Sequence, residues 1–198
     1  MEKQVDAGAM RAPVVVLPDW GTDKKIDTEC VDGPNLKMEQ WLTVDVPAWV
    51  RANLHVSQDR KSWATIGASA GGWCALMATM MHSDTYSAAI SLGGYARPVL
   101  DPPYIPFTPD SPEGRRYDLV ALAKKTPPPV SVWTLTSRPD AMSFQSTSAL
   151  TAAARKPFSV TPTVLESGRH APSVWAPYFV DALEWLPKHA NGFAATPR

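Results

Sequence analysis

The segment from Trp63 to Met81 constrains the fold of this chain more than any other. An apolar run leads into Gly67-Ala68-Ser69-Ala70-Gly71, and a helix-forming sequence follows. Gly-x-Ser-x-Gly between a strand and a helix is the pattern of a nucleophile elbow, a sharp turn that holds its serine in a strained conformation. The pattern predicts Ser69 at the apex. It also predicts that a side chain on Gly67 or Gly71 would collide with the neighbouring strand or helix.

The position of Ser69 also has a chemical consequence. The N-terminus of the following helix offers free backbone N–H groups and the positive end of the helix dipole, which favour a developing negative charge. The backbone amide of Ala70 is therefore the expected first oxyanion donor. A glycine-rich turn without catalysis is the alternative, and the strand and helix patterns on either side favour the elbow.

Length and composition indicate the class of protein. With 198 residues, 44% of them hydrophobic, the chain has enough apolar side chains for one α/β domain, expected over residues 1–198. Lys plus Arg and Asp plus Glu balance at 19 each, so we expect no nucleic-acid partner. The sequence shows no apolar run of membrane-spanning length and no signal peptide, which predicts a soluble chain.

Strand-like and helix-like patterns alternate along the chain. This alternation predicts an α/β fold, with a parallel sheet of about five strands and helices on both faces. An excursion over residues 95–113 contains six prolines and is expected to shape a pocket. The expected strands are 14–17, 65–68, 87–92, 130–136 and 160–166, and the expected helices are 2–11, 38–54, 70–81, 116–125, 141–155 and 174–186.

A serine nucleophile needs a base and a group that orients the base. His170 follows the strand ending near Glu166, and Asp140 follows the strand ending near residue 136, so both should reach the sheet edge that carries Ser69. The order Ser69, Asp140, His170 is that of α/β-hydrolase triads and predicts acyl transfer through an acyl-enzyme. Asp140 could also cap the next helix, and Glu166 or Asp101 could replace it as the acid.

Cys30 and Cys74 are the two cysteines of the chain. They lack Cys-x-x-Cys spacing and form no metal site by themselves. From the residues alone, a disulfide and two separate thiols are equally compatible with the sequence.

Several segments together resemble the esterase-D-like family of α/β hydrolases, which includes S-formylglutathione hydrolases, feruloyl esterases and mycolyltransferases. The resemblance covers roughly residues 12 to 187 and implies Ser69, Asp140 and His170 as a catalytic triad. It further implies a small-molecule ester substrate, no cofactor and no metal. The segments are Val14 to Asp19, Thr28-Glu29-Cys30, Trp41 to Thr43 with Pro47 to Trp49, Gly67 to Gly72, and Gly168 to His170 with Trp175.

Many relatives with the Thr28-Glu29-Cys30 segment are secreted or tethered to a membrane. The resemblance therefore favours the disulfide between Cys30 and Cys74, and it favours an extracytoplasmic location, although the residues themselves indicate no compartment.

The chain departs from the family pattern at its N-terminus. In the family fold about three strands precede the one that resembles Val14 to Leu17, and a loop among them supplies the second oxyanion N–H. Either the chain is the C-terminal part of a longer protein, or Val14 to Leu17 pairs directly with Thr65 to Ala68. A backbone N–H within Asp19 to Thr22, for example that of Gly21, would then substitute as donor. A sheet edge left open by the missing strands would favour a homodimer.

Three functions are compatible with the sequence. The first is a serine esterase acting on a small or aromatic acyl ester, with Trp20, Trp73 or the Pro98 to Pro112 loop in its pocket. The second is transfer of the acyl group to a sugar or lipid. The third, motivated by the missing strands, is a non-catalytic hydrolase domain that serves binding or assembly.

Overall fold

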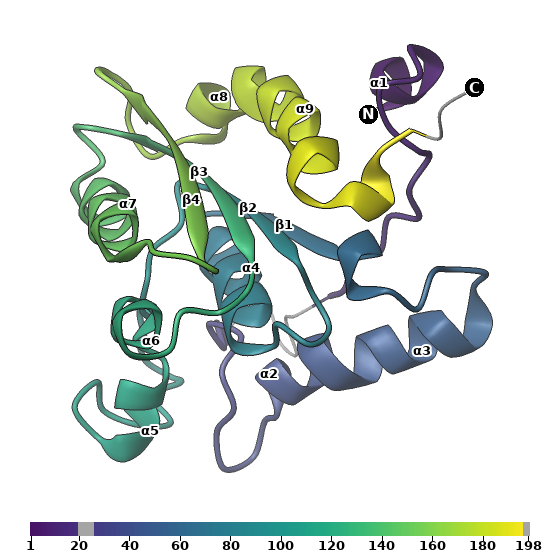
Figure 1. The fold of residues 1–198 in the computed structure, drawn as a ribbon. Coiled ribbons are helices and arrows are strands. Elements are labelled where there is room, and N and C mark those ends of the chain that lie inside the picture. The colour runs from purple at the N-terminus through teal and green to yellow at the C-terminus, as the bar shows by residue number, and fades with distance from the viewer. Residues whose placement is uncertain (20–25, 196–198) are drawn as a thin grey trace.

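The computed structural model describes residues 1–19 and 26–195 of the chain. Its centre is a sheet of parallel strands in the order β1-β2-β3-β4 (Figure 1). Because consecutive strands are neighbours and crossover connections are right-handed, the helices between the strands must all lie on one face of the sheet. The strands are β1 (Ala64–Ala68), β2 (Ala88–Leu92), β3 (Ser131–Ser137) and β4 (Ser159–Leu165).

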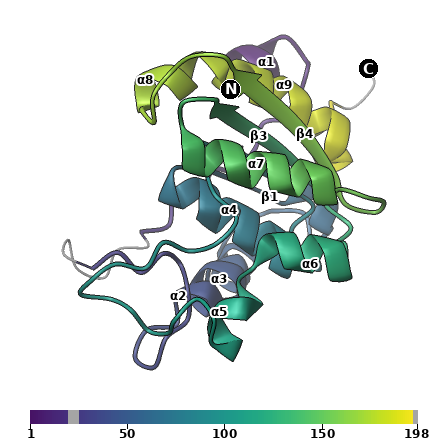
Figure 2. The same cartoon turned by 90° about the vertical axis from the view of Figure 1, so that its left-hand side faces the viewer.

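The three crossover helices cover that face. They are α4 (Ala70–Met81), α6 (Leu119–Lys125) and α7 (Ala141–Ala153). Their apolar side chains form one core cluster with Ala89 of β2 and Val132 of β3. Figure 2 shows α7 and α6 side by side beneath the sheet, with α4 next to them. The helix α4 is almost entirely buried, which agrees with its all-round apolar sequence.

The opposite face is covered by the C-terminal part of the chain. The helices α8 (Pro172–Trp175) and α9 (Phe179–His189), joined by a 3₁₀ turn, pack there against Ile90 of β2 and Trp133 of β3. Side chains alternate between the two faces along each strand, so adjacent residues of β2 belong to different clusters. Helices on both faces and a parallel sheet fit a shortened α/β-hydrolase fold, as expected.

The remaining elements lie around this framework. The helical stretch expected over 38–54 consists of α2, a π-helical turn at Trp41–Asp45, and α3. The backbone stays helical at each junction, so the three pieces form one continuous helix. Pro47 lies just after the π-helical turn, and such turns are a common place where the regular hydrogen-bond pattern of a helix is interrupted. The bounds of the other helices are α1 (Glu2–Asp6), α2 (Met38–Gln40), α3 (Val46–Asn53) and α5 (Pro112–Arg116), with 3₁₀ turns at Arg60–Ser62, Ala176–Tyr178 and Asn191–Phe193.

The strand expected at Val14 to Leu17 is absent. These four residues have no regular structure, and Leu17 is 89% exposed. Among the described residues β1 pairs with β2 alone, so the predicted pairing of residues 14–17 with 65–68 is wrong and the described sheet has four strands. Apolar composition indicates a preference for burial, but Pro13 and Pro18 on either side lack the backbone N–H that pairing uses.

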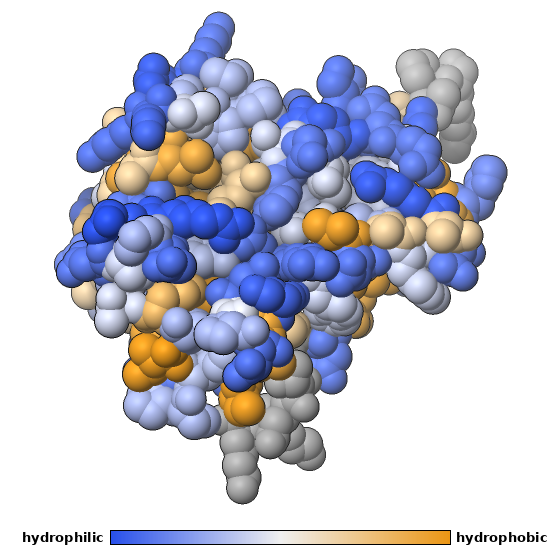
Figure 3. Space-filling model, turned by 90° about the horizontal axis from the view of Figure 1, so that it is seen from below, coloured by the Kyte–Doolittle hydropathy of each residue, from blue (hydrophilic) through white to orange (hydrophobic). Residues whose placement is uncertain are grey.

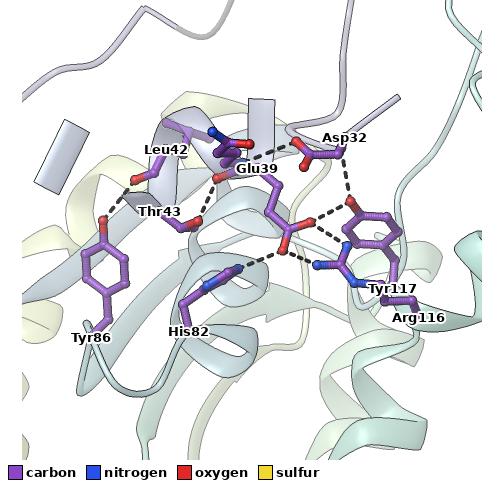
Figure 4. Close-up of polar contacts among 9 residues, drawn as sticks. Asp32, Glu39, Leu42, Thr43, His82, Tyr86, Arg116 and Tyr117 are labelled. Atoms are coloured by element: carbon purple, nitrogen blue, oxygen red, sulfur yellow. Dashed lines mark hydrogen bonds and ion pairs between the residues drawn. The ribbon is translucent and has the colours of Figure 1, made fainter. Parts of the chain in front are cut away.

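At the end of α4 remote from Ser69, buried Glu39 of α2 holds several elements together (Figure 4). His82 lies 2.7 Å from its carboxylate, Arg116 donates to both carboxylate oxygens at 2.6 and 2.5 Å, and the Tyr117 hydroxyl donates at 2.6 Å. Burial alone would raise the pKa of Glu39. The hydrogen bonds from His82, Arg116 and Tyr117 outweigh that effect and lower the pKa to about 2.

The surface on the side of α2, α3 and α5 is mixed. Figure 3 shows mainly hydrophilic residues there, with hydrophobic residues in separate patches. In the part of the chain that the structure describes, no helix is both long enough and apolar enough to cross a membrane.

Candidate active site

Ser69 occupies the turn between β1 and α4 with φ 55° and ψ −124°, a backbone conformation that residues other than glycine rarely adopt. The turn is fixed because the Ser69 N–H donates to the Leu92 carbonyl at 2.9 Å. A Cβ on Gly67 would overlap the Gly71 carbonyl oxygen, which confirms the need for glycine at 67. The same prediction for Gly71 is wrong, because a Cβ there would meet nothing within 4 Å.

The structure brings Ser69, His170 and Asp140 into one hydrogen-bonded line. Ser69 Oγ lies 2.7 Å from His170 Nε2, and His170 Nδ1 lies 2.7 Å from Asp140 Oδ2. Asp140 stands at the N-cap position of α7, but its side chain makes no capping bond and is used for His170 instead. Of the alternative acids, Glu166 is paired with Arg138 at 2.8 Å, and Asp101 bonds to neither ring nitrogen.

The imidazole of His170 is held by its surroundings. It meets the ring of Trp175 edge to face, with centroids 4.7 Å apart. The loop before it is anchored because the Ser137 hydroxyl donates to the Gly168 carbonyl at 2.8 Å, and Gly168 has φ 125°, which favours glycine. The imidazole side chain itself is 42% exposed, so it can exchange protons with solvent, whereas that of Asp140 is 9% exposed.

A cavity of about 430 Å³ opens beside Ser69 and His170. Ala70 lines it at the first position of α4, and no acceptor among residues 1–19 and 26–195 bonds to the Ala70 N–H. This amide is therefore available to an oxyanion. The predicted site residues Trp20 and Gly21 lie outside the described residues.

The predicted pocket role of Trp73 is wrong. Its side chain is fully buried, stacks on the ring of Tyr95 with centroids 6.4 Å apart, and donates from Nε1 to the Glu29 carbonyl at 2.7 Å. Trp73 thus supports the cavity wall from within the core. The proline-rich excursion does reach the cavity, through Val99 and Asp101.

The least expected feature of the cavity is the carboxyl of Glu29. The Tyr95 hydroxyl donates to it at 2.6 Å and the Val99 N–H at 3.0 Å. Burial is the largest effect on this group, and the nearby charges of Asp27 and Asp101 act in the same direction. Together they outweigh the hydrogen bonds and raise the pKa of Glu29 to about 7.

The segment that carries Glu29 is tied to α4. Glu29 and Cys30 both have positive φ, at 47° and 55°, and Cys30 forms a disulfide with Cys74 of α4. The disulfide that the resemblance favoured is thus confirmed. Because Cys74 lies five residues after Ser69, the bond holds this cavity wall close to the elbow.

Several cavity residues were not assigned from the sequence, among them Asp27, Tyr95, Met142 and Ser143. Asp27 and Tyr95 come from separate loops, Met142 and Ser143 are neighbours in α7, and the four share no motif. In the sequence, only the position of Glu29 next to Cys30 could have indicated that Glu29 lies at the cavity. Among the described residues, no group of three or more His, Cys, Asp and Glu side chains is arranged to hold a metal ion.

This chain is similar in sequence to known proteins. The sequence model of the family described as "Putative esterase" matches residues 1–188. A curated but uncharacterized protein of Corynebacterium glutamicum is 29% identical over 89 residues, which are 45% of this chain and 21% of that protein. The chain thus aligns with about a fifth of that relative's length.

Two solved structures show the same fold. One is described as a ferulic acid esterase, with TM-score 0.71, 18% identity, and coverage of 95% of this chain and 75% of that one. The other is an S-formylglutathione hydrolase from Agrobacterium tumefaciens, with TM-score 0.67, 15% identity, and coverage of 82% of this chain and 63% of that one. At these identities the likeness concerns the fold.

Proposed function

The chain belongs to the "Putative esterase" family, and on that premise we propose that it is a serine esterase that hydrolyses small carboxylic esters. The observation that carries the proposal is the line of two hydrogen bonds, each 2.7 Å long, that joins Ser69, His170 and Asp140. A serine hydroxyl needs such a base to become a nucleophile at neutral pH.

In the proposed mechanism Ser69 Oγ attacks the ester carbonyl while His170 Nε2 accepts its proton. The carboxylate of Asp140 stabilises the resulting imidazolium and keeps Nδ1 protonated. The Ala70 N–H at the start of α4 stabilises the oxyanion. His170 then returns the proton to the departing alcohol, and an acyl ester remains on Ser69.

Water completes the cycle. His170 removes a proton from a water molecule that attacks the acyl ester, and Ser69 leaves with that proton. The exposure of the imidazole agrees with access for water. The second oxyanion donor remains a prediction for the backbone between Asp19 and Thr22, and an alcohol in place of water would give acyl transfer.

The proposal is tested by the hydrolysis of p-nitrophenyl acetate and butyrate. We expect Ser69→Ala to lower kcat/KM by about a thousandfold or more, with the fold retained by circular dichroism. The double variant Ser69→Ala/His170→Ala should be no slower than the single variant, because the two residues act as one unit. Ser57→Ala, an exposed serine of a loop, serves as the matched control. Unchanged hydrolysis by Ser69→Ala would refute the proposal.

A further inference from the structure

The cavity beside Ser69 is unusually rich in carboxyl groups. Asp27, Glu29, Asp101 and Asp140 line it, and His170 is the one side chain among the described lining residues that can carry a positive charge. Asp140 is engaged by His170, so its charge is compensated when the imidazole is protonated. The other three carboxyl groups face the space that a substrate would occupy.

Asp27 and Asp101 are both exposed, and within the described part of the chain neither forms an ion pair with a lysine or an arginine. Asp27 accepts a hydrogen bond from the Glu29 N–H at 2.9 Å, which fixes it next to the cavity. Burial is the largest cause of the raised pKa of Glu29 and of the adjoining Tyr95, and the negative charges of both aspartates act in the same direction.

A second, independent observation is the hydroxyl of Ser143, one turn of α7 after Asp140. This side chain lines the same cavity, is 1% exposed, and its Oγ has no hydrogen-bond partner among the described residues. A buried hydroxyl without a partner is costly. A polar atom of a bound ligand would supply the missing partner.

We propose that this cavity selects esters that carry a positive charge, with the cationic group beside Asp27, Asp101 and Glu29 and a polar atom of the substrate at Ser143. The inference rests on the proposed esterase function and specifies its substrate class. Carboxylates that line a cleft with low-dielectric walls attract cations and repel anions. The cation that the proposal calls for is part of the ester itself, such as an ammonium group.

The test uses pairs of esters that differ only in charge. One pair is butyrylthiocholine and 3,3-dimethylbutyl thiobutyrate, in which carbon replaces nitrogen, so the charge lies in the alcohol. The second pair is the p-nitrophenyl esters of 4-(trimethylammonio)butyrate and 5,5-dimethylhexanoate, so the charge lies in the acyl group. The readout is the ratio of kcat/KM within a pair, which cancels any general effect on folding or on the reactivity of Ser69.

At low salt we expect the cationic member of one pair to be preferred by about fivefold or more, and the preference to shrink at 0.5 M salt. In Asp27→Asn/Asp101→Asn the preference should fall below about twofold. The control Asp84→Asn/Asp110→Asn removes the same charge from exposed aspartates outside the cavity lining, and its preference should stay as in the wild type.

The outcomes separate this inference from the proposed function. Equal hydrolysis of cationic and neutral esters, or a preference that persists in Asp27→Asn/Asp101→Asn, overturns the charge selection and leaves the esterase intact. A second readout is the rate at which Ser69 reacts with a cationic choline phosphorothiolate and with its neutral carbon analogue, which requires no turnover. If neither reagent reacts and no ester is cleaved, the function and the inference fail together.

Discussion

Glu29 and Glu39 lie ten residues apart, and both are almost fully buried, at 3% and 2% exposure. Each accepts a hydrogen bond from a tyrosine hydroxyl at 2.6 Å. Nevertheless, the pKa of Glu29 is raised to about 7 and that of Glu39 is lowered to about 2. Burial and a tyrosine therefore do not decide the ionisation of a carboxyl group in this protein.

The difference lies in the neighbouring side chains. Glu39 has Arg116 on both oxygens and His82 beside it, whereas Glu29 has Asp27 and Asp101. The far end of α4 is thus a closed and compensated network that joins α2, α4 and α5 (Figure 4). At the end that carries Ser69, the carboxyl groups of Asp27, Glu29 and Asp101 form no ion pair with a lysine or arginine of the described residues, and a substrate can compensate their charge.

The largest expected effect comes from breaking the compensated network. Glu39→Gln leaves Arg116 without its carboxylate partner. Because the Arg116 side chain is 49% exposed, solvent screens part of the loss, and we expect the free energy of unfolding at pH 7.5 to fall by about 2–4 kcal/mol. The matched variant Glu29→Gln removes an unfavourably buried charge. It should be as stable as the wild type at this pH, or more stable. Urea unfolding measures both variants, and equal losses would contradict the comparison.

The second prediction concerns pH. The folded state of the wild type holds the Glu29 proton up to about pH 7, whereas the unfolded chain releases it near 4.5. The stabilising effect is therefore complete below pH 4.5 and is lost as the pH rises through 7, a change of about 3 kcal/mol. Glu29→Gln lacks this loss, so its stability relative to the wild type should rise by about that amount between pH 4.5 and 7.5.

The contribution of Glu39 to stability changes with pH in the opposite direction. Its lowered pKa gives stability that is complete above pH 4.5 and is lost as the pH falls toward 2. The stability advantage of the wild type over Glu39→Gln should therefore shrink as the pH falls from 5 toward 3, whereas the effect of Glu29 lies between pH 5 and 8. If urea unfolding gives a free-energy difference between wild type and Glu29→Gln that is the same at every pH in this range, the raised pKa of Glu29 is refuted.

The smallest expected effects concern Tyr117 and Tyr95, the tyrosines that donate hydrogen bonds to Glu39 and Glu29. Tyr117→Phe removes a hydrogen bond to an ionised carboxylate at every pH above 5 and should cost about 1.5–3 kcal/mol throughout. Tyr95→Phe should cost about 1 kcal/mol more at pH 8 than at pH 5, because its hydrogen bond favours the ionised form of Glu29. Equal pH dependence of the two variants in chemical denaturation would speak against this view.

Much of the framework was predictable from the sequence. The elbow at Ser69, the helix α4 and the strands β2 to β4 were expected within a few residues, because apolar periodicity and glycine spacing report on local structure. Asp140 and His170 were expected at the same sheet edge because parallel strands end together. The segment 14–17 was misjudged, since composition says nothing about whether a strand partner lies within reach.

The environment of the site could not be predicted from local sequence patterns. The pKa of Glu29 is raised by burial that only the folded chain provides, and its hydrogen-bond partners Tyr95 and Val99 lie about 70 residues away along the chain. Trp73 was expected in the pocket, but its side chain is fully buried in the core. Such properties belong to tertiary contacts that no local pattern encodes.

Intact-mass analysis after incubation with a fluorophosphonate tests most directly whether His170 activates Ser69. We predict one adduct on the wild type, none on Ser69→Ala, and labelling of His170→Ala slowed by about a hundredfold or more. Absence of an adduct on folded wild-type protein, or an undiminished adduct on Ser69→Ala, would contradict the claim.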